Sequence, residues 1–333
     1  MSDTTKIEWV DASFSPWIGC TKVSPGCAHC YAETLDARKL WSKETHWGKG
    51  VPRRPVSEAK WREPLAWNRK ADPANRDILN PTPVQTVFPS ICDWLDNEVP
   101  IEWLARFLKL IHDTPHLRWL LLTKRPELWN DRLVATMAHV DKEWLSGHCA
   151  RSPLGEWIGR WIEAMVPQRG MASFPKNVWI GTSVENQKYA DIRIPQLLAI
   201  PAVKRFLSVE PMLGPVNLGL LGTLPKTTHP NYTTAHTELH WVIFGGESGP
   251  GASPCNNQWI RDGVRQCREA GIAPFVKQLG AFCVTDEATP DAWPPGTELE
   301  AGCPQYSLVK LKHPKGGDMS EWPEDLRVRE IPL

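Results

Sequence analysis

Short apolar runs recur along the chain and alternate with stretches of helical periodicity. The runs that we interpret as strands are Phe14–Ile18, Val84–Phe88, Trp119–Leu122, Val178–Ile180, Arg205–Val209, Trp241–Phe244 and Phe275–Val276. Apolar residues at helical spacing predict helices over Ala32–Leu40, Ile101–His112, Glu127–Met137, Leu154–Met165, Gln196–Ile200 and Trp259–Ala270. The strand runs are apolar throughout, which is typical of parallel strands buried on both faces. The pattern therefore predicts an α/β fold with a partial or full parallel (β/α) barrel of six to eight strands.

The spacing of these elements divides the chain into a barrel and an extension. We expect residues 1–283 to form the barrel, with a helical insertion at about 128–177. A second insertion at 214–240 is rich in Gly, Pro and Thr and is typical of an irregular loop that could act as a lid. Residues 284–333 are rich in proline and show little periodicity, so we expect a C-terminal extension that wraps around the barrel.

Polar residues follow almost every predicted strand at its carboxyl end. They are Ser90 and Asp93, Lys124 and Arg125, Ser183 and Glu185, Glu210, Gly245 to Glu247, and Lys277 with Gln278. Because the carboxyl ends of parallel strands share one face of a barrel, and sites are built on that face, we expect these groups to lie together.

Three cysteines near the N-terminus, Cys20, Cys27 and Cys30, are spaced C-x6-C-x2-C between the first strand and the first helix. No secretory leader is visible, so we expect a reducing cytoplasm, where clustered cysteines bind metal more often than they form disulfides. A structural zinc takes four ligands, and His29 lies between two of the cysteines in a poor place to be the fourth. A [4Fe–4S] cluster normally takes four cysteines, so one held by three keeps an iron open. Unligated structural thiols are the third alternative.

Charge is balanced over the chain but uneven along it. The 38 Lys and Arg equal the 38 Asp and Glu, so there is no global basic field for nucleic acid. Residues 38–76, however, hold eleven Lys and Arg against four acids, interleaved with Trp41, Trp47, Trp61 and Trp67. Cations with stacking rings suit a ligand that bears phosphates and bases, whereas a solvated face with inward-packed tryptophans would show the same pattern.

The residues around the cysteines resemble a known motif. Trp17-Ile18-Gly19-Cys20 and Gly26-Cys27-Ala28-His29-Cys30-Tyr31-Ala32 are similar to the GC…GCxxCYA pattern of the spore-photoproduct-lyase-like branch of radical S-adenosylmethionine (SAM) enzymes. The first gap is three residues longer than the usual C-x3-C-x2-C, and His29 stands where an aromatic residue is usual. The whole chain resembles a phage-associated radical-SAM-like family with this longer cysteine loop.

This resemblance implies a [4Fe–4S] cluster on Cys20, Cys27 and Cys30 and reductive cleavage of SAM to a 5′-deoxyadenosyl radical. It also implies a nucleic acid or nucleotide substrate that is modified or repaired, and a flavodoxin- or ferredoxin-like electron donor. The alternatives are a zinc-stabilised nucleic-acid-binding protein without enzymatic activity and a barrel hydrolase built on Glu210 and Glu247. No apolar run approaches the 18 residues of a membrane span, so we expect no membrane partner.

Roles for the strand-end residues follow from the same resemblance. Ser90 and Asp93 would meet the amino group of SAM, and Lys124 its carboxylate. Ser183 and Glu185 would meet the ribose, while Gly245, Gly246 and Glu247 would line the adenine or substrate side. Glu210, Arg125 and Lys277, with Gln278, are left to act on the substrate. The family's amino-binding Gly-Gly-Glu usually follows the second strand, where this chain has Pro89-Ser90-Ile91.

Overall fold

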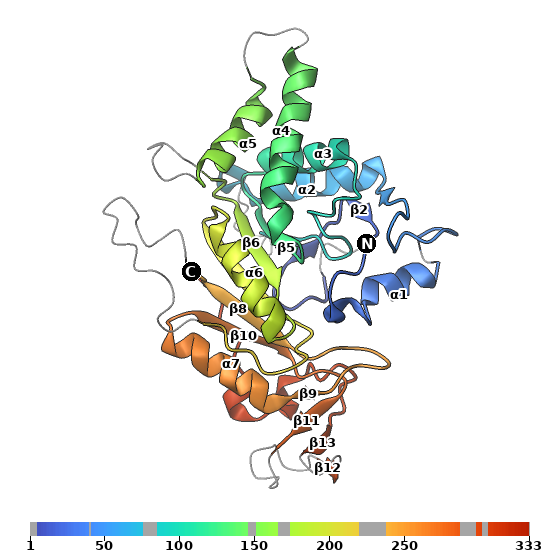
Figure 1. The fold of residues 1–333 in the computed structure, drawn as a ribbon, viewed down its shortest axis with the longest axis vertical. Helices are drawn as coiled ribbons and strands as arrows, with labels where there is room; N and C mark the ends of the chain where they lie inside the picture. The colour runs from blue at the N-terminus through green and yellow to red at the C-terminus, as the bar shows by residue number, and fades with distance from the viewer. Residues whose placement is uncertain are drawn as a thin grey trace.

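Seven parallel strands form the central sheet of the protein. The computed structural model describes residues 5–39, 41–75, 85–145, 151–165, 174–219, 238–286, 298–301 and 306–332. The strands are β1 (Ala12–Ser13), β4 (Thr86–Phe88), β5 (Arg118–Thr123), β6 (Val178–Ser183), β7 (Lys204–Val209), β8 (Trp241–Gly245) and β10 (Ala273–Gln278), adjacent in that order. Every neighbouring pair is parallel. The sheet curls into a half barrel flanked by helices (Figure 1), which confirms the predicted α/β partial barrel.

The helices connect successive strands. They are α1 (Tyr31–Ala37), α2 (Glu58–Ala71), α3 (Ile101–His112), α4 (Trp129–Leu145), α5 (Pro153–Glu163), α6 (Gln187–Ala199) and α7 (Asn257–Glu269). The bounds of α3 are those predicted, because its apolar residues repeat on one face and six of them are buried. The start expected for α6 was wrong: the helix begins at Gln187, nine residues before the predicted Gln196. Asn186 caps it by accepting a hydrogen bond from the Tyr189 amide.

The predicted first strand, Phe14–Ile18, was wrong in its bounds: two short strands lie in this region, and only the second falls within that range. β1 ends before it and joins the central sheet, whereas β2 (Trp17–Ile18) pairs antiparallel with β3 (Arg54–Pro55). Pro16 lies between them, and a proline has no amide hydrogen to donate to a sheet. The chain therefore leaves the sheet at this point and carries the cysteines onto a separate ribbon.

Two apolar layers lie on the two faces of the sheet. On β8 the side chains alternate: Trp241 and Ile243 belong to one cluster, while Val242 and Phe244 belong to the larger cluster shared with the helices. The first cluster also contains Trp9, whose ring lies 5.9 Å from that of Trp241. The N-terminal segment thus contributes a tryptophan that packs against the face of the sheet opposite the helices.

The C-terminal part of the chain contains strands that the sequence did not predict. β9 (Cys255–Asn256), β11 (Cys283–Thr285), β12 (Glu298–Ala301) and β13 (Ser307–Lys310) form a small sheet in the order β12-β13-β11-β9. The chain then returns along β10, where the Val276 amide donates to the Val328 carbonyl at 2.7 Å. This return covers the edge strand of the half barrel. Of the expected insertions, α4 and α5 occupy the first, and residues 220–237 of the second lie outside the described residues.

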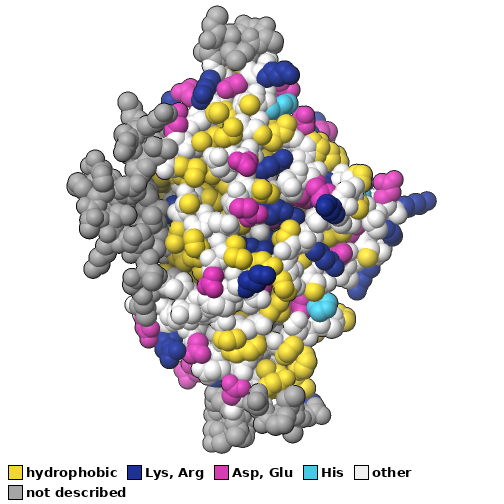
Figure 2. Space-filling model, in the orientation of Figure 1, with side chains coloured by type: hydrophobic (Ala, Val, Ile, Leu, Met, Phe, Trp, Pro, Cys, Tyr) yellow, Lys and Arg dark blue, Asp and Glu magenta, His cyan; other side chains and the backbone are white. Residues whose placement is uncertain are grey.

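Charged side chains of both signs are scattered among hydrophobic and other atoms on the face of the molecule drawn in Figure 2, and several Lys and Arg lie on the side of α1. Within the described residues, no helix has both the length and the apolar character needed to cross a membrane.

Gly181 provides a test of this packing. It pairs in register with Phe206 on β7, and a Cβ at Gly181 would lie 2.4–2.6 Å from three atoms of the Phe206 ring. We expect Gly181→Ala to lower the free energy of unfolding by about 1–3 kcal/mol, as overpacking of a core does, measured by urea denaturation. Gly214→Ala is the matched control, because nothing lies within 4 Å of its added Cβ. Equal stability of the two variants would contradict the described packing.

Candidate functional site

The cysteine loop, residues 20–30, lies over the carboxyl ends of the central strands and is fastened to four of them, β4, β5, β6 and β8. At its start, Arg125 donates to the Thr21 carbonyl at 2.8 Å and approaches the Cys20 sulfur at 3.6 Å. The Arg125 side chain is buried and also donates to Asp93 at 2.8 Å. Asp93 in turn accepts from the Thr123 hydroxyl and the Lys124 amide. This network ties the loop to the ends of β4 and β5.

The middle of the loop is fastened to the end of β6 by Glu185. The Ser24 hydroxyl donates to Glu185 Oε1 at 2.7 Å, and Arg193 Nη1 donates to Oε2 at 3.0 Å. Lys124 Nζ lies 3.4 Å from Oε1, and the Glu185 side chain is 0% exposed. Both carboxylate oxygens are therefore occupied by groups of the protein itself.

The end of the loop is fastened to the chain that follows β8. His29 Nδ1 makes a hydrogen bond of 2.9 Å with Glu247 Oε2, which also accepts from the Ser253 amide at 2.7 Å. Burial opposes ionisation of Glu247, but the Ser253 amide and His29 lower the pKa of this carboxyl below its usual value. An ionised Glu247 thus holds the residue between Cys27 and Cys30.

Gly19 and Gly26, which each precede a cysteine, lie so close to neighbouring atoms that neither position has room for a side chain. Gly19 has φ +117°, and a Cβ there would lie 2.4 Å from the His46 carbonyl oxygen. A Cβ at Gly26 would lie 2.3 Å from Glu185 Cγ. Any side chain at either position would push the loop off its supports, which gives a physical reason for both Gly-Cys pairs.

The three thiols of the loop are free and half-buried. Burial and then Asp93 raise the pKa of Cys20 to about 12, although the Arg125 guanidinium opposes the rise. Burial also raises the pKa of Cys30, while the Glu33 and Ala32 amides at the start of α1 lower it and the neighbouring Cys27 raises it. Amide donors at the start of α1 therefore act on the Cys30 sulfur, and the Lys124 charge also lowers its pKa. Binding a metal here would have to displace thiol protons.

Remaining strand-end groups form a second cluster at the same edge of the sheet. Glu210 accepts from Lys277 Nζ at 2.6 Å and from Gln278 Nε2 at 3.3 Å, which joins the ends of β7 and β10. The side chains of Glu210 and Lys277 are 18% and 19% exposed. Gly245 lies beside them, because a Cβ there would be 3.3 Å from Glu210 Cδ. These groups, unlike Glu185, keep surface that a ligand can reach.

Ser90 and Tyr31 connect the end of β4 to the start of α1. The Tyr31 hydroxyl donates to the Ser90 carbonyl, and Tyr31 is half exposed. A parallel bridge between Gly19 and Cys92 brings a fourth thiol close to Cys20. Sequence spacing alone did not single out Cys92, because it lies 62 residues after Cys30.

A buried layer beneath the loop was also missed by the sequence analysis. Arg53 donates through Nε to Asp96 at 2.8 Å and through Nη2 to the Thr21 hydroxyl at 2.6 Å. Glu98 accepts from the same hydroxyl at 2.9 Å. The side chains of Arg53 and Asp96 are both 0% exposed. An arginine inside a basic segment gives no sign in the sequence that it is buried and paired.

The predicted site residues thus fall into three groups. Asp93, Arg125, Glu185 and Glu247 make contacts that hold the cysteine loop, and the contacts with SAM or substrate that the resemblance implied for them stay predictions. Ser183 is buried at the end of β6, and Gly246 packs against the backbone of Leu279 and Gly280. Lys124, Glu210, Lys277 and Gln278 lie at the edge beside the loop.

The donor set fits an iron–sulfur cluster. Three free thiols on one loop, with amide hydrogens and cations directed at them, supply both the ligands and the hydrogen bonds that such clusters use. In the part of the chain that the structure describes, no three His, Cys, Asp or Glu side chains are grouped as a single metal ion requires.

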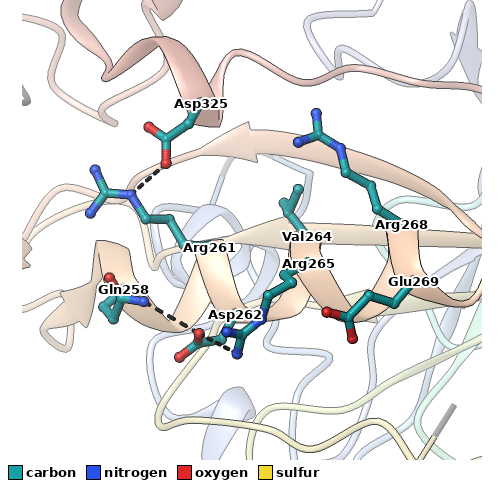
Figure 3. A pocket seen from close by; sticks show the side chains of 8 residues that line it. All are labelled: Gln258, Arg261, Asp262, Val264, Arg265, Arg268, Glu269 and Asp325. Atoms are coloured by element: carbon teal, nitrogen blue, oxygen red, sulfur yellow. Dashed lines mark hydrogen bonds and ion pairs between the residues drawn. The ribbon is translucent and has the colours of Figure 1, made fainter. Parts of the chain in front are cut away.

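A surface hollow of about 310 Å³ lies away from this loop, on α7 (Figure 3). Its charged lining residues are Arg261, Asp262, Arg265, Arg268, Glu269 and Asp325. Arg261 pairs with Asp325 at 2.6 Å and Arg265 with Asp262 at 2.9 Å. The three arginines and three carboxylates balance, so this hollow offers a ligand no excess charge.

Comparison with known families assigns the chain to one of them. The family described as "Protein of unknown function (DUF5131)" matches residues 4–317, which is most of the chain, and the chain therefore belongs to this family. No curated protein and no solved structure matches the chain significantly.

Proposed function

We propose that this member of the DUF5131 family is a radical SAM enzyme that holds a [4Fe–4S] cluster on Cys20, Cys27 and Cys30. One observation carries the proposal: the three-cysteine loop is fastened over the carboxyl ends of β4, β5, β6 and β8. That edge of a parallel half barrel is where such folds bind ligands. A cluster on this loop would face the Lys124 and Glu210 side of the barrel.

When bound, the cluster would supply the electron that splits SAM into methionine and a 5′-deoxyadenosyl radical, which takes a hydrogen atom from the substrate. The protein's own residues would hold the cysteine loop and orient SAM and the substrate. Arg125, Glu185 and Glu247 fix the loop, and we assign the carboxylate of SAM to Lys124, whose side chain is 21% exposed. Glu210 and Lys277 remain for the substrate, which we take to be a nucleic acid or nucleotide. The electron comes from a flavodoxin- or ferredoxin-like donor.

The proposal is tested by the products of SAM under reduction. Protein reconstituted anaerobically with iron and sulfide should be brown and should release 5′-deoxyadenosine and methionine in equal amounts from SAM and dithionite. Chromatography of the quenched mixture measures both products. Reconstituted Lys142→Ala, an exposed lysine on α4, is the control and should keep wild-type rates, whereas Lys124→Ala should raise the KM for SAM about tenfold or more.

A colourless protein with one zinc and no 5′-deoxyadenosine would contradict this function. That result would instead favour a zinc-stabilised binding protein. The hydrolase alternative has less support, because Glu247 is engaged by His29 and Ser253 and Glu210 is paired with Lys277.

A further inference from the structure

The basic, tryptophan-rich segment that follows α1 separates into two parts in the structure. Trp61 and Trp67 lie on α2 and are buried in the core. Trp41 and Trp47, in contrast, are only partly buried and stack on one another, with ring centroids 6.3 Å apart and planes inclined by 24°. The inward-packing explanation therefore accounts for two of the four tryptophans and leaves a stacked pair near the surface.

This stacked pair adjoins the cysteine loop. Trp47 forms a parallel bridge with Cys20, and the Gly48 amide donates to the Cys20 carbonyl at 3.0 Å. The backbone that carries the ring pair is thus hydrogen-bonded to the backbone of Cys20, which is a cluster ligand in the proposed function. A base stacked here would lie beside the site of the chemistry.

The surroundings of the pair are positively charged. Arg38, Lys39, Lys43, Lys49 and Arg54 are exposed in this segment, and Glu44 is the one exposed acid among the described residues from 38 to 54. Within the described residues, no carboxylate forms an ion pair with Lys39, Lys43 or Lys49. Figure 2 shows several Lys and Arg side chains on the α1 side of the molecule. An unpaired set of cations attracts an anionic chain, because binding releases its counterions.

We propose that the basic tryptophan surface, defined as Trp41, Trp47, Lys39, Lys43, Lys49 and Arg54, binds single-stranded nucleic acid and delivers it to the cysteine loop. Stacking on an aromatic side chain requires the face of an unpaired base, which a duplex hides, while phosphates along the strand meet the lysines. The delivery to the loop rests on the proposed function, whereas the binding does not.

Fluorescence anisotropy tests the binding on iron-free wild-type protein, so that the result does not depend on a cluster. The probes are a labelled single strand of mixed sequence, as DNA and as RNA, and the matching DNA duplex. We expect the single strands to bind more tightly than the duplex, with an affinity that falls as salt rises. Trp41→Ala should weaken single-strand binding about tenfold, whereas Trp144→Ala, an exposed tryptophan on α4, should leave it unchanged.

Charge is tested separately with a double variant. Lys43→Ala together with Lys49→Ala should reduce the slope of log affinity against log salt by about 1.4, because each phosphate contact contributes about 0.7 for a single strand. Binding by Trp41→Ala equal to wild type, equal affinity for the duplex, or no binding at about 50 mM salt would each overturn the inference. If reconstituted wild-type protein failed to cleave SAM while the iron-free protein bound single strands, the proposed function would be contradicted. The binding role of the basic tryptophan surface would still stand.

Discussion

Replacing Cys27 with alanine should reduce the iron of the reconstituted protein from about four atoms per chain to nearly none. A cluster held by three cysteines has no protein ligand to spare, so the loss of one leaves two open irons and an unstable site. Cys20→Ala and Cys30→Ala should behave alike, because all three sulfurs come from the same fastened loop. Iron and sulfide are assayed on the folded fraction after gel filtration.

Two other cysteines provide the controls for this prediction. Cys267 is buried on α7 and belongs to the core, so Cys267→Ala should keep about four irons. Cys92 is the sharper comparison, because it bridges Gly19 and so lies beside Cys20 without belonging to the motif. If Cys27→Ala kept its iron, the motif would not be the ligand set. If Cys92→Ala lost its iron at the same time, Cys92 would be a ligand in place of Cys27.

Replacing Arg53 with alanine should lower the free energy of unfolding by about 3–5 kcal/mol, because the buried Asp96 carboxylate loses its partner at 2.8 Å and keeps only the more distant Arg125 at 4.0 Å. Arg53 donates to Asp96, to the Thr21 hydroxyl and to three backbone carbonyls, and its side chain is wholly buried. Urea unfolding measures the change. The same variant should bind less iron, since Thr21 lies next to Cys20 in the loop.

Matched variants separate the buried pair from a general loss of positive charge. Arg268→Ala removes an exposed arginine of α7 and should change stability by less than about 0.5 kcal/mol. Changing Arg53 to Met and Asp96 to Leu together should recover part of the loss, because no unpaired charge is then buried. A double variant no more stable than Arg53→Ala would mean that the carbonyl contacts of Arg53, rather than its ion pair, hold this region.

The repeating strands of the fold could be predicted from the sequence because they are apolar and separated by recognisable helices. The run from Trp119 to Leu122 packs on both faces of the sheet. In α3, the spacing of the apolar residues predicts which face of the helix is buried. α2 was missed because its polar and charged residues outweigh Trp61 and Trp67, its buried tryptophans. The strand break at Pro16 was missed because the apolar run continues through it.

The site could be predicted in its location but less well in its assignments. Polar residues after parallel strands must meet at one edge, so the gathering of Lys124, Glu210 and Lys277 follows from topology. Which carboxylate is buried, and against what, depends on tertiary contacts. Glu185 and Glu247 look alike in the sequence as strand-end acids, yet they bind Ser24 and His29 of the loop. The sequence shows which chemical group a side chain carries, but not which residue that group contacts in the fold.

The electron paramagnetic resonance spectrum of the dithionite-reduced, reconstituted protein, recorded before and after SAM is added, shows whether three cysteines hold a cluster with an open iron. A cluster held by three cysteines has one iron that SAM can bind, so we predict a cluster signal that changes in shape and position when SAM is present. A cluster signal that SAM leaves unaltered, or the absence of any cluster signal in folded protein, would contradict the account.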